Sequence, residues 1–111
     1  MQGNVDMTVE DGRATAALSG DFDMAATFTV EPRFERLLAE PELDALRIDL
    51  SRLQFIDSTG IGVLMRVTDE VRRRDLDFEI VPGPREVHRV FEVAGLADAL
   101  PFAEPEPPEG A

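Results

Sequence analysis

A buried strand that leads into a glycine-rich helix start is the feature that most constrains how this chain folds. In residues 46–50, Leu46, Ile48 and Leu50 share one face, as in a strand near the centre of a sheet. Residues 57–62 read Asp-Ser-Thr-Gly-Ile-Gly and predict a helix that begins on the exposed hydroxyl of Ser58. Because a helix N-terminus has unpaired N–H groups and a positive dipole end, a serine there suits a phosphate or a partner surface.

The other apolar patterns predict an α/β domain with a small, mixed sheet. The hairpin turn Asp11-Gly12 separates the first two strands, and a Pro-Gly-Pro segment ends the last strand. In chain order the predicted elements are strands over 5–10 and 14–18, a helix over 25–40, a strand over 45–50, the helix that begins at Ser58 with its apolar stripe over 61–71, a strand over 77–81 and a helix over 87–94.

A single ordered domain is expected over residues 1–102, because 111 residues with 43% hydrophobic content suffice for one core. Leu96, Leu100 and Phe102 are expected to pack back onto this body. Residues 103–111 are acidic and rich in proline, with no apolar side chain larger than alanine. Such a segment cannot bury enough surface to offset its ordering entropy, so we expect a disordered tail.

Composition excludes several classes of function. The chain has no cysteine and no lysine, which removes thiolate metal sites, cysteine nucleophiles, Schiff-base chemistry and a P-loop lysine. A formal charge of −12 disfavours nucleic acid and anionic lipid as partners. No apolar run approaches the roughly 20 residues of a membrane span, and residues 1–6 do not read as a signal peptide, so we expect a cytoplasmic protein without membrane insertion.

Ser58 has two interpretations from the sequence alone. As the helix N-cap, its oxygen would accept a hydrogen bond from Gly60 or Ile61, and its replacement by alanine would cost about 1 kcal/mol. Alternatively, Ser58 is modified or contacts a partner. Gly60 and Gly62 favour close backbone approach, since glycine in a helix costs roughly 1 kcal/mol, although they could also let the first turn lie tight against the sheet.

Three aspartates also follow predicted strands and could share one edge of the sheet. Asp21, Asp23 and Asp57 could form a Mg²⁺ site of the receiver-domain kind, but the lysine that such chemistry needs is missing. Turn and capping roles are the alternative. His88 is the only histidine, and its place beside Val87, Val90 and Phe91 predicts a solvated surface position rather than a catalytic base.

Three segments together resemble the STAS domain, in particular that of the bacterial anti-sigma factor antagonists. These are Ile48-Asp49-Leu50-Ser51, the run from Phe55 to Leu64 that contains Asp57-Ser58-Thr59-Gly60-Ile61-Gly62, and the run from Val87 to Leu96. The resemblance covers nearly all of the expected domain. It implies a single STAS-like α/β domain, with a mixed sheet of about four strands and helices packed mainly on one side.

The resemblance also implies a partner switch without catalysis or a cofactor. In such a switch the unphosphorylated antagonist binds an anti-sigma factor serine/threonine kinase and releases its sigma factor; phosphorylation abolishes binding and a serine phosphatase resets it. By position, Ser58 is the phosphoacceptor and Thr59 a secondary site. The alternative is a STAS-like regulatory subunit of a transporter or lipid-transport complex. The implied partner-binding residues are Asp21, Asp23, Asp57, Ser58, Thr59, Gly60, Ile61 and Gly62.

Overall fold

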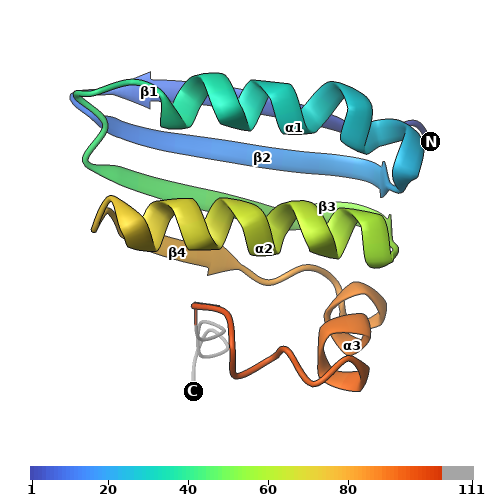
Figure 1. Cartoon of the computed structure of the whole chain (residues 1–111). Coiled ribbons are helices and arrows are strands. Elements are labelled where there is room, and N and C mark those ends of the chain that lie inside the picture. Colours follow the sequence, from blue (N-terminus) through green and yellow to red (C-terminus); the bar gives the residue numbers. More distant parts are fainter. Residues whose placement is uncertain (104–111) are drawn as a thin grey trace, which may run out of the picture.

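The computed structural model describes residues 1–103, which form one four-stranded sheet and three helices (Figure 1). The elements follow the predicted order: β1 (Asn4–Glu10), β2 (Arg13–Phe22), α1 (Met24–Leu38), β3 (Ala45–Ile56), α2 (Ser58–Arg73), β4 (Asp77–Val81) and α3 (Arg85–Val93). The strand order is β1-β2-β3-β4; β1 is antiparallel to β2, and the other two pairs are parallel. The predicted α/β class and small mixed sheet are confirmed.

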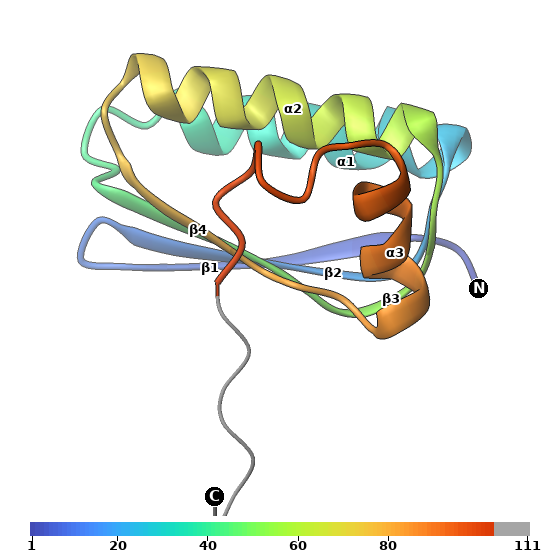
Figure 2. The same ribbon diagram turned by 90° about the horizontal axis from the view of Figure 1, so that it is seen from below.

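The sheet has one apolar and one polar face, because its strands alternate. On β2, every second residue from Ala14 to Phe22 is buried, whereas the residues between them are partly exposed. Helices α1 and α2 lie side by side over the apolar face, and no helix of residues 1–103 covers the opposite face (Figures 1 and 2). The predicted packing of helices on one side is therefore confirmed.

Helix α1 buries a stripe at helical spacing that includes Ala26, Val30 and Phe34. Phe28 of the same helix lies outside this stripe, and its side chain is 76% exposed. It lies two positions after Ala26 and two before Val30, which places it about 200° around the helix from each. Phe28 therefore points to solvent.

The C-terminal residues of the domain return to the sheet, as predicted. Phe102 forms a parallel bridge with Ile80 of β4, where the Ile80 N–H donates to Pro101 and the Ala103 N–H donates to Ile80. Ala103, predicted to start the tail, thus contacts the sheet, and residues 104–111 lie outside the described residues.

His88 is half-buried rather than solvated, which corrects the sequence prediction. Its ring packs edge-on against Phe102 with centroids 4.8 Å apart, and it lies 6.3 Å from Phe91. The returning C-terminal segment covers a position that the helix pattern alone left exposed.

Strand β3 is longer than predicted and runs to Ile56 instead of stopping at Leu50. Its second half continues to pair with β2 after register shifts, with Ser19 opposite Arg52 and Phe22 opposite Ile56. As a result β2 and β3 end together, and the helices that follow them begin side by side (Figure 1).

Candidate functional site

Two helix N-termini meet at the carboxyl edge of the sheet, and each is capped by an aspartate. Asp23 accepts from the Ala26 N–H at 3.0 Å and caps α1. Asp57 caps α2 and accepts from the N–H groups of Thr59 at 3.0 Å and Gly60 at 3.1 Å. The predicted capping role of these aspartates is confirmed, whereas the interpretation of Ser58 as the N-cap is wrong. The cap lies one residue earlier because the Asp57 N–H still bonds the Phe22 carbonyl at the strand end.

Ser58 is the first residue of α2 and is exposed. Within residues 1–103 its hydroxyl has no hydrogen-bond partner. The neighbouring Thr59 hydroxyl instead donates to the Asp57 carboxylate at 2.5 Å and is partly buried. Of the two adjacent hydroxyls, only that of Ser58 is thus free to react within the described part of the chain.

The Asp57 carboxylate is the fixed negative charge beside Ser58. The Thr59 hydroxyl lowers the pKa of Asp57 below its usual range, and the N–H groups of Gly60, Thr59 and Met24 act in the same direction. Partial burial opposes these bonds without reversing the shift. Asp57 is therefore ionised at neutral pH, so that a phosphate on Ser58 would carry its charge next to a carboxylate.

The two glycines of the motif have different surroundings. A Cβ on Gly60 would lie 2.4 Å from the Phe22 carbonyl oxygen, so this glycine lets the first turn of α2 lie against the end of β2. A Cβ on Gly62 would meet only the flexible end of Arg66, at 3.3 Å. Gly60 has the packing role that the sequence allowed, and Gly62 leaves an open surface beside Ser58.

Asp21 does not join the other two aspartates in one cluster. Its neighbour across the sheet is Phe55, on the face without helices, and its carboxylate pairs with the α-amino group of Met1 at 3.0 Å. Within residues 1–103 no three His, Cys, Asp or Glu side chains are placed to hold a metal ion. The aspartates of this edge cap a helix or pair with an amine.

Exposed apolar side chains surround this edge, and sequence patterns did not reveal them. Met24 is 58% exposed at the start of α1, Phe28 lies one turn further along, and Phe55 is 48% exposed near the end of β3. Exposed apolar side chains that gather beside a free hydroxyl are typical of a contact surface. The signal that could have located Phe28 is its offset from the buried stripe of α1.

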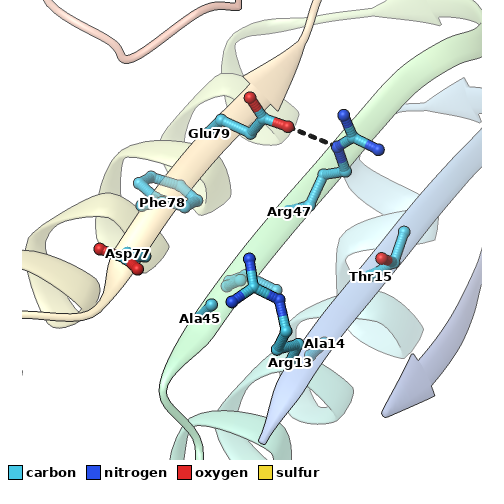
Figure 3. Close-up of a pocket in the computed structure, with 9 residues that line it drawn as sticks. Arg13, Ala14, Thr15, Ala45, Arg47, Asp77, Phe78 and Glu79 are labelled. Carbon is cyan, nitrogen blue, oxygen red and sulfur yellow. Dashed lines mark hydrogen bonds and ion pairs between the residues drawn. The ribbon is translucent and has the colours of Figure 1, made fainter. Parts of the chain in front are cut away.

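A hollow on the face without helices lies at the opposite end of the parallel strands (Figure 3). It is lined at the amino ends of β2, β3 and β4 by residues such as Arg13, Arg47 and Asp77, and Arg47 pairs with Glu79 at 2.5 Å. Because the strands start here and end at Ser58, this hollow is separate from the candidate site.

None of the described helices combines the length and the apolar character that crossing a membrane requires.

A model of the STAS domain family matches residues 4–106. The anti-sigma-B factor antagonist of Staphylococcus aureus (strain NCTC 8325 / PS 47) is 26% identical over 100 residues, which cover 87% of this chain and 89% of that protein. The anti-sigma F factor antagonist of Paenibacillus polymyxa is 23% identical over 102 residues, covering 92% and 87% of the two chains.

Solved structures have the same fold. An anti-sigma factor antagonist from Mycobacterium paratuberculosis superposes with a TM-score of 0.78 at 23% identity, covering 94% of this chain and 87% of its own. The antagonist SpoIIAA in its unphosphorylated form gives a TM-score of 0.76 at 19% identity, with 91% and 89% covered. A sulfate transporter family protein from Wolinella succinogenes gives 0.68 at 19% identity, with 86% and 79% covered. Because the fold occurs in both classes, the site has to distinguish them.

Proposed function

This chain belongs to the STAS domain family, and we propose that it is an anti-sigma factor antagonist whose switch is Ser58. In this proposal the unphosphorylated protein binds an anti-sigma factor serine/threonine kinase, which then releases its sigma factor. The kinase transfers the γ-phosphoryl group of ATP to the Ser58 Oγ; the bond to ADP breaks and the hydroxyl proton is released. A serine phosphatase hydrolyses the phosphoester and resets the switch in the cytoplasm.

The single observation that carries the proposal is the free hydroxyl of Ser58 at the start of α2. Ser58 is exposed, while the adjacent Thr59 hydroxyl is held by Asp57 at 2.5 Å. Modification of Thr59 would have to break that bond and weaken the cap of α2. We therefore assign Ser58 as the acceptor and Thr59 as at most a secondary site.

The partner surface in this proposal comprises the carboxyl edge and its apolar surroundings. Met24 and Phe28 on α1 would anchor the contact, because exposed apolar side chains release the most free energy when a partner covers them. The polar members are the three aspartates, Ser58 and Thr59, and Gly60, Ile61 and Gly62 complete the first turn of α2. In this surface Asp21 takes part only at the rim, since it lies on the other face of the sheet.

Phosphate would act on the partner rather than on the fold. It adds about −1.5 to −2 charge, and a helix N-terminus favours that charge by roughly 0.3–1 kcal/mol. By contrast, two unit charges about 5 Å apart at an effective dielectric of about 20 repel by roughly 3 kcal/mol, about a hundredfold in affinity if the facing kinase surface is acidic. The domain therefore serves as a binding module and a substrate, with no catalysis of its own.

The test is to incubate the protein with its cognate anti-sigma factor kinase and ATP, and to map the phosphate by mass spectrometry. We expect label on Ser58, none in Ser58→Ala, and near wild-type labelling in the matched control Ser51→Ala, which removes an exposed serine of β3. Label on Ser19 or Ser51 in place of Ser58 would refute the assignment. A pull-down that returns transporter subunits and no kinase would favour the transporter-regulating alternative.

A further inference from the structure

Arg66 of α2 has one guanidinium nitrogen, Nη1, that is unpaired within residues 1–103 and lies on the same side of the helix as Ser58. Its Nε and Nη2 donate to the two carboxylate oxygens of Glu31 on α1, at 2.7 and 3.2 Å. This pairing fixes the guanidinium plane and leaves Nη1 without a partner in the described part of the chain. Arg66 itself is 62% exposed, so a second anion can reach it.

The free Nη1 of Arg66 lies beside Gly62. Nη1 lies 3.3 Å from the position that a Cβ of Gly62 would occupy. Ser58, Gly62 and Arg66 are spaced four residues apart, so they form one stripe along α2, and Cβ positions at this spacing are about 5–6 Å apart. A phosphate on the Ser58 Oγ extends over much of that distance, and the side-chain atoms found within 4 Å of a Cβ at Gly62, among the described residues, all belong to Arg66.

A phosphate on Ser58 also needs such a cation. The ionised Asp57 carboxylate lies on one side of it, and Asp23 caps the neighbouring helix. The other arginines of α2, Arg72 and Arg73, lie at its far end. Building on the proposed function, we propose that Arg66 is the intramolecular counter-ion of phosphorylated Ser58, reached across Gly62 and held in position by Glu31.

This arrangement leaves the pair between α1 and α2 intact while the phosphate is bound. Nη1 donates to a phosphate oxygen, and Nε and Nη2 stay on Glu31. The phosphate is thereby drawn along α2 and away from Asp57, which fixes the direction in which the kinase surface meets it. Glu31 acts here as a positioning residue, since it contacts the arginine and not the phosphate.

The experiment uses the full chain with phosphoserine incorporated at position 58 during translation, so that no kinase is needed. The second ionisation of the phosphate is followed by ³¹P NMR as a function of pH. Arg66→Gln should decrease the second ionisation constant of the phosphate about threefold, because the dianion loses a nearby positive charge. This factor corresponds to the attraction between two unit charges about 5 Å apart in water with salt. The matched control Arg73→Gln removes an exposed arginine of the same helix that pairs with Glu70 at 2.9 Å, and should leave the constant unchanged.

A second variant, Gly62→Leu, keeps Arg66 and places a leucine side chain between the Arg66 guanidinium and the phosphate on Ser58. It should reproduce the decrease seen with Arg66→Gln. An unchanged ionisation constant in Arg66→Gln would overturn the inference. This failure is distinct from that of the proposed function: the NMR result does not depend on any kinase, and labelling of Ser58 by a kinase does not depend on Arg66.

Discussion

Helices α1 and α2 begin in the same way but present different chemistry to solvent. Each follows a parallel strand of the sheet, and each is capped by an aspartate, Asp23 or Asp57. The first residue of α1 is Met24, with Phe28 one turn on, whereas α2 begins with Ser58, followed one turn later by Gly62. The two helix starts therefore share the same backbone arrangement, and the side chains make the start of α1 apolar and the start of α2 hydroxyl-bearing.

This difference gives the two helix starts different roles in the proposed switch: α1 would contact the partner, and α2 would carry the modification that regulates the contact. The α1 start offers apolar area, which gains free energy from any partner that covers it. The α2 start offers a hydroxyl whose modification changes the local charge without requiring the fold to change. In the proposed switch, the modification of Ser58 on α2 would act on a partner contact made largely by α1.

Gly60→Ala should have the largest effect on stability, because it disturbs the packing of the first turn of α2 against the end of β2. Its Cβ would lie 2.4 Å from the Phe22 carbonyl oxygen, and backbone cannot move aside as a side chain can. We expect the free energy of unfolding to fall by about 3 kcal/mol in urea denaturation. Gly62→Ala is the matched control and should be neutral or gain up to about 1 kcal/mol from helix propensity. Equal loss in both variants would contradict the assigned packing role.

Phe28→Ala tests the apolar start of α1. If the partner covers this side chain, kinase affinity should fall about tenfold, or about 1.4 kcal/mol, in isothermal titration calorimetry. The unfolding free energy should change by less than about 0.5 kcal/mol, since Phe28 is exposed. The control Val93→Ala removes an apolar side chain of α3 that is 79% exposed, and should leave affinity unchanged. Wild-type affinity of Phe28→Ala would remove Phe28 from the partner surface.

Asp57→Ala tests the N-cap of α2, and should lower the free energy of unfolding by about 1 kcal/mol at pH 7. The pKa of Asp57 is lower in the folded protein than in the unfolded chain, so its stabilising contribution is complete above the ordinary carboxylate pKa. That contribution is lost as the pH falls through the lowered folded pKa. In denaturation experiments from pH 7 into the acid range, the free energies of unfolding of the wild type and of Asp57→Ala should therefore converge. A constant difference at every pH would show that the charge of Asp57 does not contribute.

Ser58→Ala should have the smallest effect on the fold. The Ser58 hydroxyl has no partner within residues 1–103, so the unfolding free energy should stay within about 0.5 kcal/mol of the wild type. Kinase binding should persist and no longer respond to ATP. A loss of 1 kcal/mol or more in thermal or urea unfolding would show that the hydroxyl caps the helix after all.

Local sequence patterns predicted the order of the strands and helices, and non-local contacts determined the end of β3, the N-cap of α2 and the burial of His88. The alternation of Leu46, Ile48 and Leu50 located the central strand, but its extension to Ile56 depends on pairing with β2 through register shifts that no local pattern shows. Asp57 and Ser58 are both good capping residues, and the bond from Asp57 to Phe22 selects the first. His88 became half-buried because Phe102, far along the chain, folds over it.

The bridge between Ile80 and Phe102 also limits how copies of this chain can associate. A strand edge can recruit another strand, and a sheet with two open edges can grow in both directions into a fibre. Here residues 101–103 occupy part of the β4 edge, and at the β1 edge the Arg33 guanidinium donates to the Val5 carbonyl. Pairing of two copies through β1 would leave only the obstructed β4 edges outward, so edge-to-edge growth would stop at a dimer.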